Sequence, residues 1–153
     1  TIIQIGNGLE KKLNIIQNDA RKISLKNDPV VFIDSPYSDN IKYSDHPKCI
    51  GKIPCTDEKF FKELEKVARE IHRILKPDKY MAWLIGDHWR KNTGYIPVGF
   101  RIYNMLCNLF NPIDVICVVR RNQTSNTGLW HKRAREFNFY LRGFKYLFIL
   151  RKA

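Results

Sequence analysis

The sequence lacks the features that would place a protein in a membrane or direct it to a secretory route. Its apolar residues never form the run of roughly 18 that a transmembrane helix requires. The start, Thr1 to Gln4, carries no basic residue, and the chain turns polar by Gly6, so no signal peptide is recognisable. We therefore expect a cytoplasmic protein, and we interpret Thr1 in place of Met as a processed or trimmed start.

Cysteine is scarce, with four residues in 153. Cys107 and Cys117 lie in apolar segments, where a cysteine behaves as a small hydrophobic residue. His46, Cys49 and Cys55 are close in sequence, but no fourth ligand has the spacing of a zinc site. We expect free thiols and no bound metal.

Acidic residues are also few. The 15 Asp and Glu are outnumbered by 27 Lys and Arg, which gives a formal net charge of +12. Such an excess favours a polyanionic partner, most simply nucleic acid, although a lysine-rich proteome would produce the same bias. Hydrophobic residues make up 44% of the chain, which excludes disorder and predicts a single domain with a substantial core.

Short apolar runs typical of strands alternate with amphipathic stretches typical of helices. The strand-like runs are residues 13–17, 30–33, 81–85, 115–119 and 146–150. A helix is expected from its cap at Thr56 to a stop at Lys76-Pro77, and another from Pro97 to about residue 110. This order predicts an α/β fold with a mostly parallel sheet. Its last strand should be antiparallel, because no helix precedes it.

Two polar segments interrupt this pattern. Residues 38–56 form a long loop, and loops of that length in compact domains are usually functional. Residues 120–135 are predicted to be a basic loop that contacts phosphates, with a solvated charged loop as the alternative. Its candidate nucleic-acid contacts are Arg120, Arg121, Trp130, Lys132, Arg133 and Arg135.

The most informative stretch is the apolar run 30–33, which leads directly into Asp34-Ser35-Pro36-Tyr37. A run this short and apolar is typical of a strand buried on both faces, and Pro36 ends it. Asp34 and Tyr37 then lie at the carboxyl end of a buried strand, where open α/β sheets bind ligands. An acid beside an aromatic ring suits a flat, hydrogen-bonding substrate such as a nucleobase. The alternative is an ordinary turn that begins at Asp34.

Residues 34–37 resemble the Asp-Pro-Pro-Tyr motif of AdoMet-dependent DNA amino-methyltransferases, which modify adenine N6 or cytosine N4. Residues 75–87, 95–100 and 142–152 resemble the segments that follow in such enzymes, so the resemblance spans about residues 13–152. It implies one catalytic region over residues 1–153 with a Rossmann-like methyltransferase sheet. It also implies S-adenosyl-L-methionine as cofactor, duplex DNA as partner and a base flipped out of the stack.

The resemblance also implies roles for single residues. The Asp34 side chain and the Ser35 carbonyl would accept hydrogen bonds from the exocyclic amine, Pro36 would hold the turn, and Tyr37 would stack on the base. Asp34 would also border the cofactor. Asp19-Ala20 resembles the acid-Ala pair that contacts the cofactor adenine, with a turn-capping role for Asp19 as the alternative.

Two departures from the family pattern matter. Ser35 stands where the motif has its first proline, and the Gly-rich AdoMet loop is missing, since Gly6-Asn7-Gly8 is better interpreted as a turn. We therefore expect an incomplete sheet, and a chain that is a fragment, a split enzyme or one subunit of a pair. The alternatives are an RNA or tRNA base methyltransferase and a catalytically inactive nucleic-acid-binding subunit.

Overall fold

A computed structural model of the chain describes residues 19–24, 26, 28–120 and 128–153. The strand expected at residues 13–17 and the Gly6-Asn7-Gly8 turn lie outside these residues. None of the described helices is long and apolar enough to span a membrane. The described elements are, in order, β1 (Asp28–Asp34), η1 (Ile50–Lys52), α1 (Glu58–Ile74), β2 (Leu75–Ile85), β3 (His88–Arg90), β4 (Gly94–Ile96), α2 (Val98–Cys107), β5 (Asn111–Val119), α3 (Gly128–Glu136) and β6 (Phe144–Arg151).

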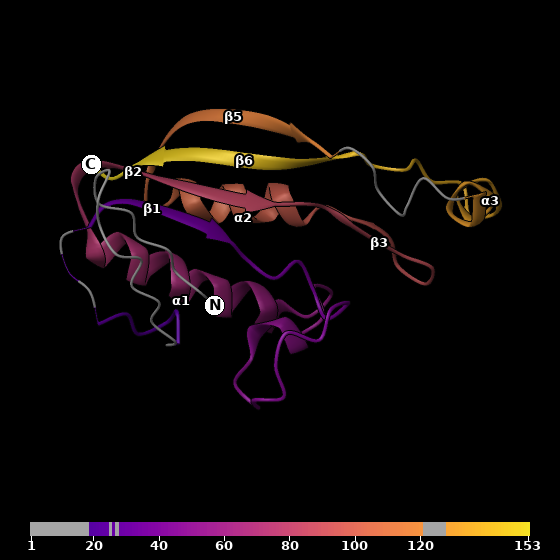
Figure 1. Ribbon diagram of the computed structural model, residues 1–153, viewed down its shortest axis with the longest axis horizontal. Helices are drawn as coiled ribbons and strands as arrows, with labels where there is room; N and C mark the ends of the chain where they lie inside the picture. The colour runs from indigo at the N-terminus through magenta and orange to yellow at the C-terminus, as the bar shows by residue number, and fades with distance from the viewer. Residues whose placement is uncertain (1–18, 25, 27, 121–127) are drawn as a thin grey trace, which may run out of the picture.

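Four of the strands form one mixed sheet in the order β1-β2-β6-β5 (Figure 1). Strands β1 and β2 pair in parallel, whereas β6 pairs antiparallel with β2 on one side and with β5 on the other. Strands β1, β2 and β5 therefore run in the same direction, and β6 lies between β2 and β5 and runs in the opposite direction. This confirms the predicted α/β fold with an antiparallel last strand, in a described sheet that is mixed because β6 pairs antiparallel with both of its neighbours.

Helix α1 forms because its apolar residues recur at helical spacing and build one continuous stripe. All the residues of that stripe are buried: Phe60, Leu64, Val67, Ile71 and Ile74. The cap is Asp57, whose side chain accepts a hydrogen bond from the Lys59 backbone N–H, so the prediction of Thr56 as the cap is wrong by one residue. A carboxylate at this position also interacts favourably with the positive end of the helix dipole.

The core lies on one face of the sheet. Val31 and Ile33 of β1 are buried with Met81 and Trp83 of β2 in one cluster that also holds the apolar faces of α1 and α2. On the opposite face Val30 and Phe32 are 49% and 51% exposed. The prediction that β1 is buried on both faces is therefore wrong for the described residues.

Three segments differ from the predicted elements. Strand β2 begins at Leu75, before the predicted run 81–85, and includes Pro77. Its first residues are irregular, since its register with β1 shifts and Asp78 has a positive φ, and a proline is tolerated in such a segment. The short hairpin β3–β4 was not predicted at all. The basic segment 120–135, predicted as a loop, contains helix α3, whose residues are all at least partly exposed.

Candidate functional site

The predicted corner at the end of β1 is present. Asp34 is the last residue of β1 and its side chain is exposed. The Tyr37 hydroxyl donates a hydrogen bond of 2.7 Å to Asp34 Oδ1, so the turn folds the tyrosine back onto the acid. Burial, together with this bond to a carboxylate, raises the pKa of Tyr37, and the phenol therefore stays a donor at neutral pH. Asp34 Oδ2 has no partner among the described residues.

Ser35 is buried, and its hydroxyl has a structural role. It accepts a hydrogen bond of 2.9 Å from the indole Nε1 of Trp83, a fully buried residue of β2. The bond satisfies the only polar atom of the Trp83 side chain and ties the corner to the neighbouring strand. A proline at position 35 would fix the backbone but leave this indole without its acceptor. Ser35 therefore holds the corner through a side-chain hydrogen bond, where a proline would hold it by restricting the backbone φ.

The loop that follows Tyr37 is attached to two other elements. The buried Ser38 hydroxyl accepts hydrogen bonds of 3.0 Å from the Cys55 backbone N–H and of 3.0 Å from the Arg90 guanidinium of β3. Arg90 also forms an ion pair with Asp39. The Asn40 amide lies 2.9 Å from Nε2 of His88, at the start of β3. The hairpin β3–β4 is therefore held beside the corner.

A second acid lies at the same edge of the sheet, because β1 and β2 are parallel neighbours. Asp87 follows the end of β2 and accepts three hydrogen bonds. They come from the Gly99 backbone N–H at 2.9 Å, the Tyr95 hydroxyl at 2.7 Å and the Tyr146 hydroxyl at 2.9 Å. Burial and the bond to Asp87 raise the pKa of Tyr146 to about 12. Asp87 was not predicted as a site residue, although its position at a strand's carboxyl end follows the same rule as that of Asp34.

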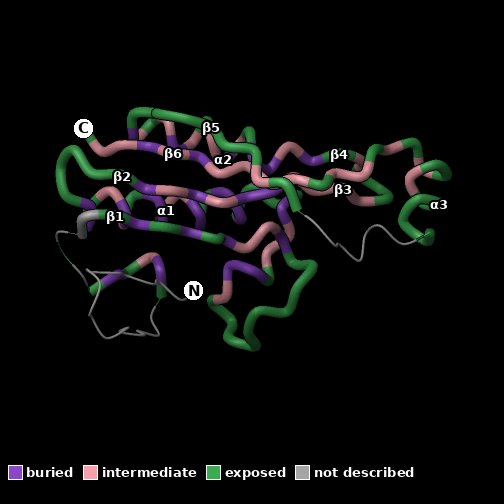
Figure 2. Tube along the Cα trace, turned by 45° about the horizontal axis from the view of Figure 1, so that its top comes forward, coloured by how far each residue is buried: buried purple, intermediate pink, exposed green. Residues whose placement is uncertain are grey.

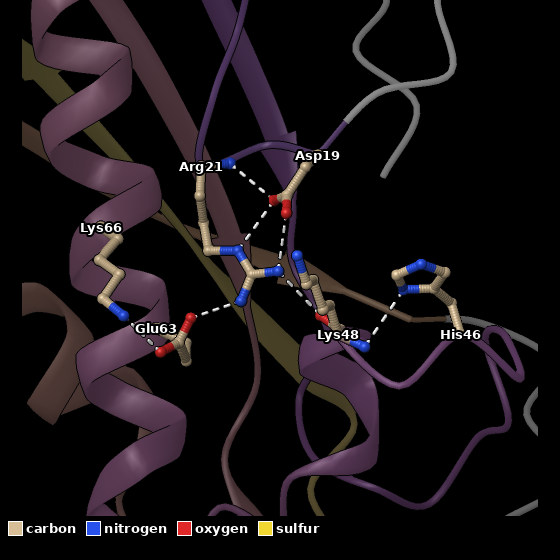
Figure 3. Close-up of polar contacts among 6 residues, drawn as sticks. All are labelled: Asp19, Arg21, His46, Lys48, Glu63 and Lys66. Carbon is tan, nitrogen blue, oxygen red and sulfur yellow. Dashed lines mark hydrogen bonds and ion pairs between the residues drawn. The ribbon is translucent and has the colours of Figure 1, made fainter.

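Asp19 and Ala20, the predicted cofactor contacts, belong to a polar network beside α1 (Figure 3). Both Asp19 carboxylate oxygens accept hydrogen bonds from Arg21, which also reaches Glu63 of α1 at 2.5 Å and the Lys48 carbonyl at 2.9 Å. The hydrogen bonds from Arg21 lower the pKa of Asp19 to about 2. Ala20 is buried in the core. Their contact with a cofactor stays a prediction.

The predicted nucleic-acid contacts fall into two groups, and Arg121 lies outside the described residues. Arg120 lies at the end of β5, where its backbone N–H donates to the Gly143 carbonyl at 2.7 Å. It is near enough to Tyr37 to oppose the rise in pKa that burial causes there. The others are on α3, which Figure 1 places beyond the hairpin at the end of the molecule toward which β1 and β2 point. These α3 residues, all at least partly exposed, are Trp130, Lys132, Arg133 and Arg135.

No cluster of metal-ligating side chains exists within the described part of the chain. His46, Cys49 and Cys55 do not form one: His46 Nδ1 accepts a hydrogen bond from the Lys48 backbone N–H, Cys49 is half-buried and Cys55 is fully buried. All four cysteines are unpaired. The candidate chemistry of the site therefore rests on carboxylates, hydroxyls and aromatic rings.

No family model and no curated protein matches the chain, whereas solved structures do. A putative DNA modification methylase from Thermus thermophilus matches 88% of this chain and 50% of its own, with a TM-score of 0.57 at 20% identity. Its complex with S-adenosyl-L-methionine matches 88% of this chain and 53% of its own, with a TM-score of 0.57 at 22% identity. The chain has a methyltransferase-like fold.

The methyltransferase-like fold of this chain is a partial one, because the chain spans about half the length of the putative methylase that it matches. Its four-stranded mixed sheet and the helices beside it correspond to part of their fold. Within this part, Asp34 and Asp87 lie at the carboxyl edge of the methyltransferase-like sheet, with the hairpin β3–β4 next to them.

Proposed function

We propose that this chain is the base-binding part of an AdoMet-dependent enzyme that methylates an exocyclic amine of a DNA base, adenine N6 or cytosine N4. The observation that carries the proposal is the corner at the end of β1, where Tyr37 folds onto Asp34 and leaves one carboxylate oxygen toward solvent. The methyltransferase-like fold and the excess of basic residues support it.

The proposed role of the corner follows from the weakness of the nucleophile. The lone pair of an exocyclic amine is delocalised into the ring, so acceptors that bind its N–H groups favour attack by the nitrogen. Asp34 Oδ2 and the Ser35 carbonyl supply two such acceptors. The bonds from Tyr37 to Asp34 and from Trp83 to Ser35 hold both in place before substrate arrives, which reduces the cost of positioning.

Tyr37 supplies a stacking surface for the base in this proposal. The Lys145 ammonium lies 4.6 Å from the centre of the Tyr37 ring and covers one of its faces. Tyr37 is half-buried and packs against the core, so in this proposal a flipped base stacks on the part of the ring that stays exposed, and stacking of this kind contributes roughly 1–3 kcal/mol per base. Lys145 is then placed to contact a phosphate of the same strand.

The described residues fit S-adenosyl-L-methionine in part. The exposed Asp34 carboxylate suits a cationic sulfonium, and the Asp19 carboxylate, whose side chain is 39% exposed, is an acceptor suited to the adenine amine. The cofactor, when bound, supplies the methyl group. We assign the rest of its binding to the half of the methyltransferase fold that this chain does not span.

The exposed sheet face gives that second half a place to pack. Phe32 of β1 is aligned with Ala82 of β2 and Ile149 of β6, and Leu84 with Leu147 and Ile116. These apolar side chains are exposed or half-buried. In a sheet with helices on both faces, such positions are covered. We propose that helices carrying the AdoMet loop, from the same protein or from a second subunit, cover this face.

Methyl transfer to DNA tests the function directly. With the complete protein or assembly, radiolabelled AdoMet and duplex DNA, Asp34→Ala is expected to lower the methylation rate about a hundredfold or more, because one preorganised acceptor is lost. The matched control is Asp45→Ala, which removes an exposed loop carboxylate that pairs with Lys42 and should leave the rate unchanged. Circular dichroism checks that both variants fold.

Two results would count against this function. Wild-type methylation by Asp34→Ala would remove the corner from the chemistry. Methyl incorporation into tRNA but not into duplex DNA would favour an RNA methyltransferase instead.

A further inference from the structure

A cavity of about 540 Å³ lies between the hairpin β3–β4 and the segment 137–146, which the proposed chemistry does not use. We name it the hairpin cavity. Its lining is mostly aromatic, and among the described residues Asp87 is the only acid that lines it. The cavity is also lined by Trp89, Phe139, Tyr140, Lys91, Arg142 and Tyr95.

The aromatic rings of the hairpin cavity are ordered against one another. Trp89 of β3 stacks on Phe139 with ring centroids 4.1 Å apart and planes 25° apart, and Phe137 lies 5.8 Å from the same indole. Neither Trp89 nor Phe139 is fully buried, and Tyr140 beside them is 91% exposed. An aromatic side chain that exposed gains nothing from the core, whereas it can stack on a planar ligand.

The charges around the hairpin cavity favour an anion. Lys91 lies 4.8 Å from the Phe137 ring and Arg142 lies 4.9 Å from the Tyr95 ring, so two cations line the cavity. The single carboxylate, Asp87, already accepts three hydrogen bonds. Because those donors offset its charge, the cavity as a whole presents positive charge next to flat apolar surfaces.

The hairpin cavity adjoins the corner at Asp34. The contact between Asn40 and His88 joins the loop after Tyr37 to the strand that carries Trp89. Lys145, which covers the Tyr37 ring, is on the same strand as the lining residues Phe144 and Tyr146, whose side chains point to the opposite face of β6. The cavity and the corner are thus linked through β3, so a strand bound at the corner can extend toward the cavity.

We propose that the hairpin cavity binds one unpaired nucleotide of a nucleic-acid strand, adjacent to the base held at Asp34. Its base stacks on Tyr140 and the Trp89–Phe139 pair, and its phosphate lies against Lys91 and Arg142. The site takes the nucleotide through its π-face and its phosphate, so it binds single strands with little sequence preference. Methylation of the neighbouring base rests on the proposed function, but strand binding by this cavity does not.

The test is binding of fluorescein-labelled single-stranded (dT)12, measured by fluorescence anisotropy without AdoMet. Tyr140→Ala is expected to weaken binding about tenfold, which is the effect of losing one base-stacking contact. Its matched control is Tyr80→Ala, which removes an exposed tyrosine in the middle of β2, outside the cavity lining, and should bind like the wild type. Phe139→Leu should also weaken binding, with its fold checked by circular dichroism.

The outcomes separate the candidate ligands. Unchanged affinity in both Tyr140→Ala and Phe139→Leu would overturn the proposal, as would equal affinity for thymidine monophosphate and (dT)12, which indicates a free-nucleotide site. Binding of an aromatic-rich peptide in place of (dT)12 would overturn it too. A protein that transfers no methyl group but loses (dT)12 affinity in Tyr140→Ala would reject the proposed function and keep this inference.

Discussion

At the scale of single residues, the candidate site is held by side-chain hydrogen bonds that join distant parts of the sequence. Asp34 and Tyr37 were predictable, because a proline after a short apolar run fixes where the strand ends. The Trp83–Ser35 bond was not, since its partners lie 48 residues apart and a serine gives no signal of its partner. Asp87 could have been predicted by the same strand-end rule. Its three hydrogen-bond donors could not, because they come from β4, α2 and β6, whose positions the sequence does not give.

Asp19 offers a test of the network in Figure 3 through pH. Its pKa is lowered from 3.8 to about 2 in the folded chain, chiefly by hydrogen bonds from Arg21. The stability it adds is therefore fully present above pH 3.8 and is lost as the pH falls toward 2. Because its side chain is 39% exposed, solvent screens the pair, and Asp19→Asn should cost about 1 kcal/mol at pH 7.

Urea unfolding of wild type and Asp19→Asn at pH 7 and at pH 2.5 measures this difference, which should shrink at the lower pH. Asp45→Asn is the control, since it removes a carboxylate that is 82% exposed and reports the general effect of added positive charge. A stability difference for Asp19→Asn that is equal at both pH values would show that the ion pair with Arg21 is not its source.

At the scale of elements, the sequence predicted what periodicity encodes. The stripe of α1 and the apolar runs in β1, β2, β5 and β6 give repeating signals over several residues, and the structure contains all of them. The hairpin β3–β4 has three residues in each strand, too few for an alternating pattern. Helix α3 has no buried residue, so no apolar stripe marks it. Apart from Ile96 of β4, which is buried in the core, the side chains of these two missed elements are half-buried or exposed.

The start of α1 allows a sharp test at this scale, because two adjacent residues compete for the cap. Asp57 accepts from a helical backbone N–H, at 2.8 Å from the nitrogen of Lys59. Asp57→Ala should therefore lower the free energy of unfolding by about 1 kcal/mol, the usual cost of losing such a cap. Thr56→Ala should change it by much less. Chemical unfolding of the two variants decides the matter, and equal losses would contradict a cap at Asp57.

At the scale of the whole molecule, the core with α1 and α2 lies on one face of β1, β2 and β6, whereas the other face of the described sheet and both faces of β5 stay largely exposed. Figure 2 shows the exposed edge strand β5 along most of its length. The alternation along β1, with Val31 and Ile33 buried and Val30 and Phe32 exposed, comes from this one-sided packing. The sequence could not reveal this one-sided burial. Four consecutive apolar residues are expected whether the helices that cover the second face of β1 belong to the described chain or come from elsewhere.

The proposed cover predicts how a charge on the open face would act. Phe32 is the most exposed apolar residue of β1, so Phe32→Glu should leave the described half folded. A carboxylate beneath a packed helix is costly to bury, so the second half should dock poorly. We expect AdoMet affinity, measured by calorimetry on the complete protein or assembly, to fall at least about tenfold. Ile113→Glu, at the irregular start of edge strand β5, should preserve it. Unchanged AdoMet affinity in Phe32→Glu would mean that the cofactor half does not pack on this face.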